Sequence, residues 1–136
     1  MKIHTKVRYG LRAMIEIANN KSLNGLFQKQ ISANQKIPLK YLDSIIMGLK
    51  NTGLIVNFAG KSSGYVLSKQ PNEISVYDIY RAFEPELTLV NCSYEGTQCE
   101  QFDICPSKDY WYELNNEIKN KMKSSKLLEF INENAQ

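Results

Sequence analysis

The chain has 136 residues, of which 43% are hydrophobic and 23% are charged, and its formal net charge is +3. This length predicts one compact domain with at most a small appendage. No apolar run reaches the roughly 18 residues that a membrane-spanning helix needs, which excludes such a helix. The basic amino-terminal stretch lacks the apolar core of a secretory signal. We therefore predict a cytoplasmic protein whose cysteines are reduced.

The charge is divided unevenly along the chain. Residues 1–69 contain eleven Lys or Arg and only two acids, Glu16 and Asp43, for a net charge of +9. Residues 70–136 contain six basic and twelve acidic residues, for a net charge of −6. This segregation favours a polyanion-binding module followed by a part that avoids the polyanion. The alternative is that the lysines only make the surface soluble.

Apolar side chains recur at helical spacing in three segments of the basic half. The first predicted helix covers residues 6–19, the second covers 27–35, and the third starts near Pro38 and is stopped by Gly53. The tight turn near Lys36 gives the second and third helices helix-turn-helix spacing. The apolar faces of the first and third helices consist of Val7, Leu11, Met14, Ile15 and Ala18, and of Leu39, Leu42, Ile45, Ile46 and Leu49.

Two short strands are predicted next, over residues 54–58 and 65–69, with the turn-rich connector AGKSSG between them. Three helices followed by a hairpin is the order of a winged-helix domain. A further amphipathic helix covers residues 75–84, with Ser75 as its N-cap. The predicted fold class is therefore mostly α with a small β-hairpin wing.

A long helix is predicted from residue 108 towards the carboxyl terminus. Few local partners exist for its apolar stripe in so small a protein, so we expect the stripe to be buried against a second copy of the chain. The sequence thus predicts a homodimer. The stripe and its continuation consist of Trp111, Leu114, Ile118 and Met122, followed by Leu127, Leu128 and Ile131.

In a helix-turn-helix the second helix enters the DNA major groove, and its first residues meet base edges. Lysines in this region can contact phosphates, whereas Tyr and Ser can hydrogen-bond to bases or phosphates. Each lysine has the alternative of a solvated surface charge, and Tyr41 has the alternative of local packing. Asp43 repels phosphate but can accept from a cytosine amine, so it can discriminate between operators. The candidate DNA-binding residues are Lys36, Leu39, Lys40, Tyr41, Asp43 and Ser44, and Gly60, Lys61 and Ser62 at the hairpin tip.

Four motifs together resemble the Rrf-type winged-helix transcription regulators, the group that contains IscR, NsrR and CymR. They are KVRYGLRAM, IPLKYLDSIIMGLKNTGLI, GKSSGYVLSK and ISVYDIYRAFE, and the resemblance covers nearly the whole chain. It implies a homodimer with a long carboxyl-terminal dimerisation helix and a palindrome-like operator. Members commonly carry Arg-Gly-Pro-Gly-Gly-Gly-Tyr at the wing, where this chain has AGKSSGY, so the operator of better-known members does not carry over.

Every cysteine of the chain lies in CSYEGTQCEQFDICP, at Cys92, Cys99 and Cys105. Thiolates are the usual protein ligands of iron–sulfur clusters, and gaps of six and five residues let a loop wrap one object. The iron–sulfur branch of the resembled family, IscR-like, binds a cluster through three cysteines in this loop. The resemblance therefore implies a two-iron or four-iron cluster on these thiols.

The sequence does not decide which group donates the fourth ligand of such a site. By resemblance, IscR places a histidine three residues after the third cysteine, where this chain has Lys108, and NsrR uses a carboxylate where this chain has Arg8. His4, the single histidine, is a candidate fourth ligand near the expected approach of the partner subunit, with a helix-start or phosphate role as the alternative. The other options are a small exogenous thiol and the carboxylates Glu100, Asp103 and Asp109.

Other uses of the cysteines remain as alternatives. Structural zinc prefers four protein ligands with short Cys-x2–4-Cys pairs, which are missing here. Two of the thiols can form a disulfide in air, and all three can act as redox switches. CymR-like members bind no cluster and respond through a partner protein. The chain has no Gly-x-Gly-x-x-Gly motif, P-loop or evident carboxylate pair, so no enzyme is predicted.

The predictions combine into three parts. Residues 1–84 form a winged helix-turn-helix DNA-binding domain, residues 85–107 form a cysteine-containing cluster-binding loop, and residues 108–136 form a dimerisation helix. The predicted function is a homodimeric transcription regulator, such as a repressor, whose operator binding is controlled by the cluster. The signal would be iron–sulfur status, redox state or nitric oxide.

Overall fold

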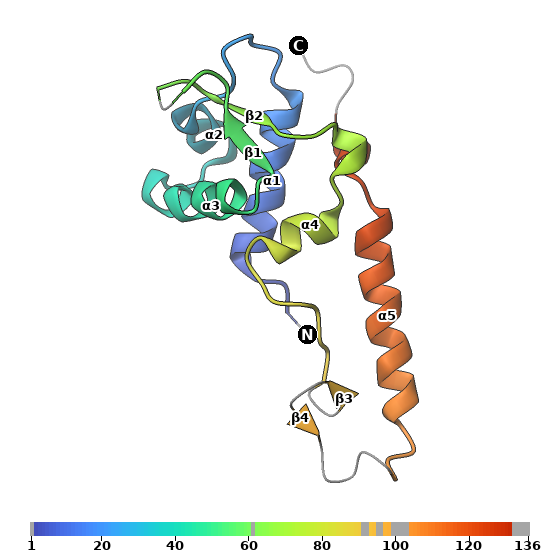
Figure 1. The fold of residues 1–136 in the computed structure, drawn as a ribbon. Helices are drawn as coiled ribbons and strands as arrows, with labels where there is room; N and C mark the ends of the chain where they lie inside the picture. The colour runs from blue at the N-terminus through green and yellow to red at the C-terminus, as the bar shows by residue number, and fades with distance from the viewer. Residues whose placement is uncertain (1, 61, 91–92, 95–96, 99–103, 132–136) are drawn as a thin grey trace.

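The computed structural model describes residues 2–60, 62–90, 93–94, 97–98 and 104–131. Helices α1–α3 and the hairpin β1–β2 form one body, and α5 extends from it towards the end of the molecule that carries β3 and β4 (Figure 1). No helix in these ranges is long and apolar enough to cross a membrane. The elements are α1 (Thr5–Asn19), α2 (Gln28–Gln35), α3 (Leu39–Asn51), β1 (Ile55–Asn57), β2 (Tyr65–Leu67), η1 (Pro71–Glu73), α4 (Val76–Arg81), β3 (Ser93–Tyr94), β4 (Thr97–Gln98), α5 (Lys108–Ser124) and η2 (Leu127–Phe130).

The helix-turn-helix forms as predicted. Lys36 ends α2 in the left-handed conformation, with φ +55°, and its neighbour Ile37 turns into the core. Pro38 then precedes the first residue of α3, where its missing N–H costs nothing. Gly53, with φ +77°, takes the left-handed conformation just beyond α3. The turn and both helix ends are thus set by local sequence.

The hairpin carries a third short partner that the sequence pattern did not reveal. β1 and β2 pair antiparallel, with Val56 opposite Val66. Leu26, just before α2, forms an isolated bridge with Tyr65 through two backbone hydrogen bonds of 3.0 and 2.8 Å. Gly25 (φ +79°) and Gly64 let the two backbones approach, because a Cβ on either glycine would lie about 2.5 Å from the other segment. This close contact joins the wing to the start of α2.

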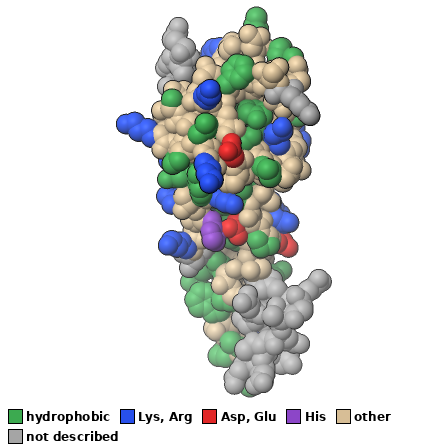
Figure 2. Space-filling view, turned by 90° about the vertical axis from the view of Figure 1, so that its left-hand side faces the viewer, with side chains coloured by type: hydrophobic (Ala, Val, Ile, Leu, Met, Phe, Trp, Pro, Cys, Tyr) green, Lys and Arg blue, Asp and Glu red, His purple; other side chains and the backbone are tan. Residues whose placement is uncertain are grey.

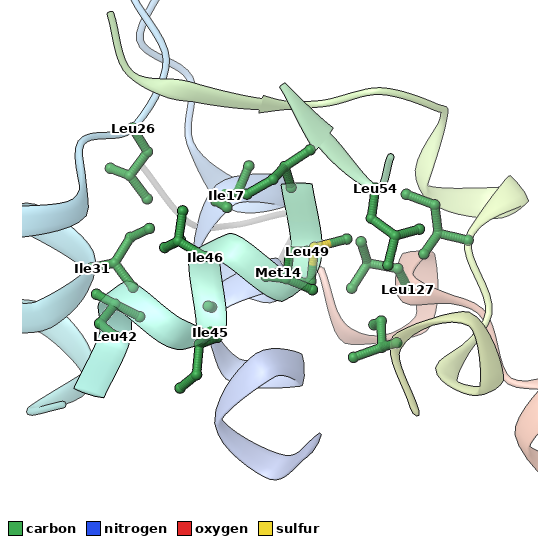
Figure 3. Close-up of a cluster of buried hydrophobic side chains, with 14 of the residues drawn as sticks. Met14, Ile17, Leu26, Ile31, Leu42, Ile45, Ile46, Leu49, Leu54 and Leu127 are labelled. Atoms are coloured by element: carbon green, nitrogen blue, oxygen red, sulfur yellow. The ribbon is translucent and has the colours of Figure 1, made fainter. Parts of the chain in front are cut away.

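One hydrophobic core lies between α1, α3, the hairpin and α4 (Figure 3). α1 and α3 bury the faces that their periodicity predicts, and the last contribution comes from η2, near the end of the chain. Figure 3 shows Leu127 on the same side of the cluster as Leu54. The core residues are Ala13, Met14, Ile17, Leu26, Ile31, Ile37, Leu42, Ile45, Ile46, Leu49, Leu54, Ile55, Ile74, Ile79 and Leu127.

α4 is held to the body by a cap and by an aromatic ring. Ser75 is the N-cap: its hydroxyl accepts from the Asp78 amide at 3.0 Å, and the Asp78 carboxylate accepts from the Ser75 amide at 2.9 Å. After the helix, the Phe83 ring lies between two glycines of the neighbouring helices. A Cβ on Gly10 of α1 or on Gly48 of α3 would lie 2.5 or 2.6 Å from that ring.

The carboxyl-terminal helix, predicted over residues 108–136, is shorter than expected. α5 ends at Ser124, and Ser125 adopts an extended conformation. The chain then pairs with the segment before α4, since the Val76 amide donates to the Ser125 carbonyl and the Leu127 amide donates to the Ile74 carbonyl, both at 2.8 Å. Burial of Leu127 in the winged-helix core outweighs continuation of the helical pattern.

α5 packs against α4 and the segment that follows it. Asn115 is 1% exposed, and its Oδ1 accepts from the Leu89 amide at 2.9 Å. Lys119 lies 2.5 Å from the Glu86 carboxylate, which lowers the Glu86 pKa. Lys123 lies over the Tyr77 ring at 5.3 Å. The chain itself therefore covers one side of α5, and the stripe residues Leu114, Ile118 and Met122 are half-buried.

Candidate nucleic-acid interface and cysteine segment

The outer face of α3 is distinct from its core face. Four apolar residues point into the core, and the opposite side of the helix is exposed. Helical spacing of three and four residues places the exposed residues in one line along the helix. They are Leu39, Lys40, Asp43, Met47 and Lys50.

Asp43 is held in place by the first residue of α2. The Gln28 side-chain amide donates to Asp43 Oδ1 and, at 3.4 Å, to the Leu39 carbonyl. This hydrogen bond fixes the carboxylate near the middle of the exposed line. Gln28 was not among the predicted site residues, because its contact with Asp43 joins positions fifteen residues apart.

Tyr41 and Ser44 make local contacts. The Tyr41 ring packs edge-on against Tyr9 of α1, with centroids 5.7 Å apart, and the Ser44 hydroxyl donates to the Tyr41 carbonyl at 2.8 Å. Both residues are half-buried. The ring of Tyr41 therefore packs locally, which was the alternative to DNA contact. Lys36 and Lys40, in contrast, are exposed.

The wing tip is a tight turn closed by Ser63. Its hydroxyl accepts from the Ala59 amide and donates to the Gly60 carbonyl, both at 2.7 Å. Gly60 has φ +101°, a conformation that favours glycine. Ser62 is exposed, and Lys61 lies outside the described residues. Small side chains thus leave the backbone of the tip accessible.

Lys and Arg side chains are spread over the face that carries α2 and α3, and acidic side chains are rare on its upper part (Figure 2). Arg12 has a structural role, because its guanidinium donates to the Gln35 side chain at 2.8 Å and to the Gln35 carbonyl. Gln35 in turn donates to Glu16 at 2.5 Å, so these three residues fasten α1 to α2. The exposed cations of α1, α2 and α3 and their flanks are Lys2, Lys6, Arg8, Lys21, Lys29, Lys36, Lys40 and Lys50.

Cys105 is the one predicted metal-binding thiol within the described residues, because Cys92 and Cys99 lie outside them. It precedes α5 and is partly exposed. Its Sγ lies 3.3 Å from the Ser107 hydroxyl, and hydrogen bonds from this hydroxyl and from the Ser107 amide lower the pKa of the thiol. A lower pKa favours the thiolate, which is the form that binds metal.

His4 lies at the start of α1 and faces the end of α4. Its Nε2 is 3.4 Å from Glu84 Oε1, and Figure 2 shows the single histidine beside acidic side chains. Burial and the nearby Glu84 raise the pKa of Tyr80, which lines the same hollow of about 250 Å³. Figure 1 shows the first turn of α1 well apart from the first turn of α5. Within one chain, His4 and Cys105 are therefore not brought together.

Of the three carboxylate ligand candidates, one lies within the described residues and two lie outside them. Asp109 lies in the first turn of α5 and is exposed, whereas Glu100 and Asp103 are outside the described residues. Among the residues that are described, no three His, Cys, Asp or Glu side chains form a group that could hold a metal ion. The set of ligands stays a prediction.

The model of the Rrf2 family, described as an iron-dependent transcriptional regulator, matches residues 3–133. The chain belongs to the Rrf2 family. Among curated relatives of this Rrf2 protein, "Protein rrf2" of Nitratidesulfovibrio vulgaris is 30% identical, and the match covers 96% of this chain and 87% of the relative. The regulator IscR of Cronobacter sakazakii is 27% identical over 97% of this chain and 81% of its own length.

Solved structures of Rrf2 proteins have the same fold. CymR, the global cysteine regulator of B. subtilis, matches with a TM-score of 0.75 and 29% identity over 94% of both chains. T. potens IscR matches with a TM-score of 0.73 and 28% identity over 94% of this chain and 84% of its own. The predicted winged-helix fold is confirmed, and the protein is a DNA-binding transcription regulator.

Proposed function

We propose that this Rrf2 protein is a homodimer whose operator binding is controlled by an iron–sulfur cluster on Cys92, Cys99 and Cys105. The observation that carries the proposal is the placement of Cys105, which lies partly exposed just before α5 with its Sγ 3.3 Å from the Ser107 hydroxyl. Three thiols within fifteen residues form a donor set that suits iron. When bound, the cluster supplies a centre that responds to redox state, iron supply or nitric oxide.

The cysteine segment is the predicted loop of residues 85–107. The way it is attached to the rest of the chain supports its role as a sensor. Its start is held to α5 where the Leu89 amide donates to Asn115, and its end runs through Ser107 directly into α5. α5 in turn is tied to the winged-helix core through Leu127. A change in the segment therefore acts on α5 and, through it, on the relative position of two DNA-reading heads.

A donor from the partner subunit would complete the site. Lys108 and Arg8 stand where IscR and NsrR place their fourth ligands, and neither ligates iron well when protonated. His4 pairs with Glu84 within its own chain, so its use as a ligand requires approach of the second subunit. We propose His4 as this donor, because it is the only imidazole of the chain.

Exposed aromatic residues at the start of α5 support a homodimer. Tyr110 and Trp111 pack edge-on with centroids 5.0 Å apart, and Tyr112 beside them is also exposed. Ile104, just before the helix, is 75% exposed. Because a cluster of exposed apolar side chains is typical of a protein contact surface, we propose that a second α5 covers this surface, together with the half-buried stripe next to it.

We expect Trp111→Glu to convert the protein into a monomer, because the new carboxylate would be desolvated in the subunit contact. Sedimentation velocity on the purified protein measures the mass. Lys121→Glu, which introduces the same side chain at an exposed position of α5, serves as the control and should stay dimeric. A wild-type protein that sediments as a monomer at micromolar concentration would contradict the homodimer.

Anaerobic purification tests the cluster. We expect a brown protein that contains iron and sulfide and absorbs in the visible range, and we expect each single Cys→Ala variant to lose the colour. Thr88→Ala, an exposed change near the start of the predicted loop and before its first cysteine, should retain it. Operator affinity, measured by fluorescence anisotropy, should change by about tenfold between the loaded and the cluster-free protein, as a coupling of 1–3 kcal/mol implies.

Two results would favour the alternatives. A colourless protein with stoichiometric zinc would mean a structural metal site. A colourless, metal-free protein whose operator affinity responds to an oxidant would mean control by the thiols themselves. One solved structure is relevant to this second result. Staphylococcus aureus CymR, which is 30% identical with a TM-score of 0.70, was solved in an oxidized form.

A further inference from the structure

Met47 lies on the outer face of α3 and is 62% exposed. It follows Asp43 by one helical turn and Leu39 by two turns, so the three side chains share one line. Its neighbours in sequence, Ile46 and Leu49, are buried in the core. The exposure of Met47 is therefore a property of this face and not of a loosely packed helix end.

The surface around Met47 is hollowed. A cavity of about 450 Å³ is lined by Gln28 of α2, by the α3 residues Asp43, Ile46, Met47, Lys50 and Asn51, and by Tyr65 of β2. Gln28 hydrogen-bonds to Asp43 on one side, and Lys50 lies over the Tyr65 ring at 5.6 Å on the other. Because both apolar and polar side chains line this cavity, it can accept an apolar group that is attached to a polar ligand.

The surrounding charge identifies that ligand as duplex DNA. Residues 1–69 have a net charge of +9, and Lys40 and Lys50 belong to the exposed line of α3 that contains Met47. A major groove with phosphates on both edges complements this arrangement. The one apolar group that a base presents in the major groove is the thymine methyl.

The geometry points to a specific role for Met47. An α-helix rises 1.5 Å per residue, so Met47 lies about 6 Å along the axis from Asp43, which corresponds to roughly two base pairs at about 3.4 Å each. We propose that Met47 is a specificity-determining residue that packs against a thymine methyl about two base pairs from the base nearest Asp43. This proposal rests on DNA binding through α3 but does not depend on the cluster.

Replacement of single thymines by deoxyuridine, which lacks only the methyl, tests this role. The operator is first selected from random duplex DNA with the wild-type protein, and each thymine of a half-site is then replaced in turn. We expect one replacement, at a contacted thymine, to weaken wild-type binding by roughly fourfold, the value for one buried methyl group. Met47→Ala should bind the unmodified operator less tightly and lose its sensitivity to that replacement.

Leu128→Ala is the matched control, since Leu128 is exposed and belongs to η2 and not to α3. It should keep the wild-type response to every replacement. The proposal is overturned if Met47→Ala retains the full response, or if no deoxyuridine replacement weakens wild-type binding. Assays of both the cluster-loaded and the cluster-free protein separate the two ideas, because equal operator affinity in the two states contradicts cluster control and leaves the thymine result intact.

Discussion

Leu127→Ala is expected to lower the free energy of unfolding by about 2–5 kcal/mol, the usual range for truncation of a buried leucine. Leu127 is 0% exposed and belongs to the winged-helix core, although it lies near the end of the chain. Its amide also donates to the Ile74 carbonyl at 2.8 Å. The substitution leaves a cavity and weakens the attachment of α5 to the DNA-binding body. Chemical denaturation of the purified protein measures the loss.

Leu128→Ala provides the matched comparison, because Leu128 is the next residue and is 52% exposed. It should change the free energy of unfolding by no more than about 0.5 kcal/mol. Equal losses in the two variants would mean that the carboxyl-terminal segment is not anchored through Leu127. In the cluster-loaded protein, Leu127→Ala should also reduce the effect of the cluster on operator affinity, since the path from α5 to the core is weakened.

Gly64→Ala is expected to destabilise the wing by about 1–3 kcal/mol, the range for overpacking. A Cβ at this position would lie 2.5 Å from the Gly25 carbonyl carbon, and backbone cannot move aside as a flexible side chain can. The two segments must separate, which strains the hydrogen bonds between Leu26 and Tyr65 and the one from the Gly64 amide to the Asn24 carbonyl. Amide hydrogen exchange at Leu26 and Tyr65 should accelerate.

Ser62→Ala is the control for the wing, since Ser62 is exposed and lies in the same turn. It should leave both the stability and the exchange rates near the wild-type values. Because we predict that the wing contacts DNA, Gly64→Ala should also weaken operator binding without a change in cluster content. Unchanged exchange at Leu26 in Gly64→Ala would contradict the close backbone contact.

Much of the body follows from local patterns. The apolar periodicity of α1 and α3, the tight turn near Lys36, the stop at Gly53 and the N-cap Ser75 each depend on residues a few positions apart. Such features are encoded within one element and its flanks, which is why the sequence predicts them. The family motifs extend the same information to the DNA-binding function.

Other features depend on residues that are distant in sequence. The Gln28–Asp43 hydrogen bond, the contact between Gly25 and Gly64, and the Phe83 ring between Gly10 and Gly48 all join separate elements. Leu127 continues the apolar pattern of α5, yet it folds back because the winged-helix core accepts it. Periodicity indicates which side chains are apolar, but it does not identify the surface that buries them.

The sequence by itself determined the winged helix-turn-helix, the basic amino-terminal half and the three clustered thiols, because these depend on residue type, spacing and composition. Only the tertiary structure decided that α5 ends at Ser124, that Arg12 joins α1 to α2 through hydrogen bonds to Gln35, and that Met47 is exposed in a hollow on α3. The physical reason is that burial and hydrogen bonding depend on contacts between elements that lie far apart in the sequence.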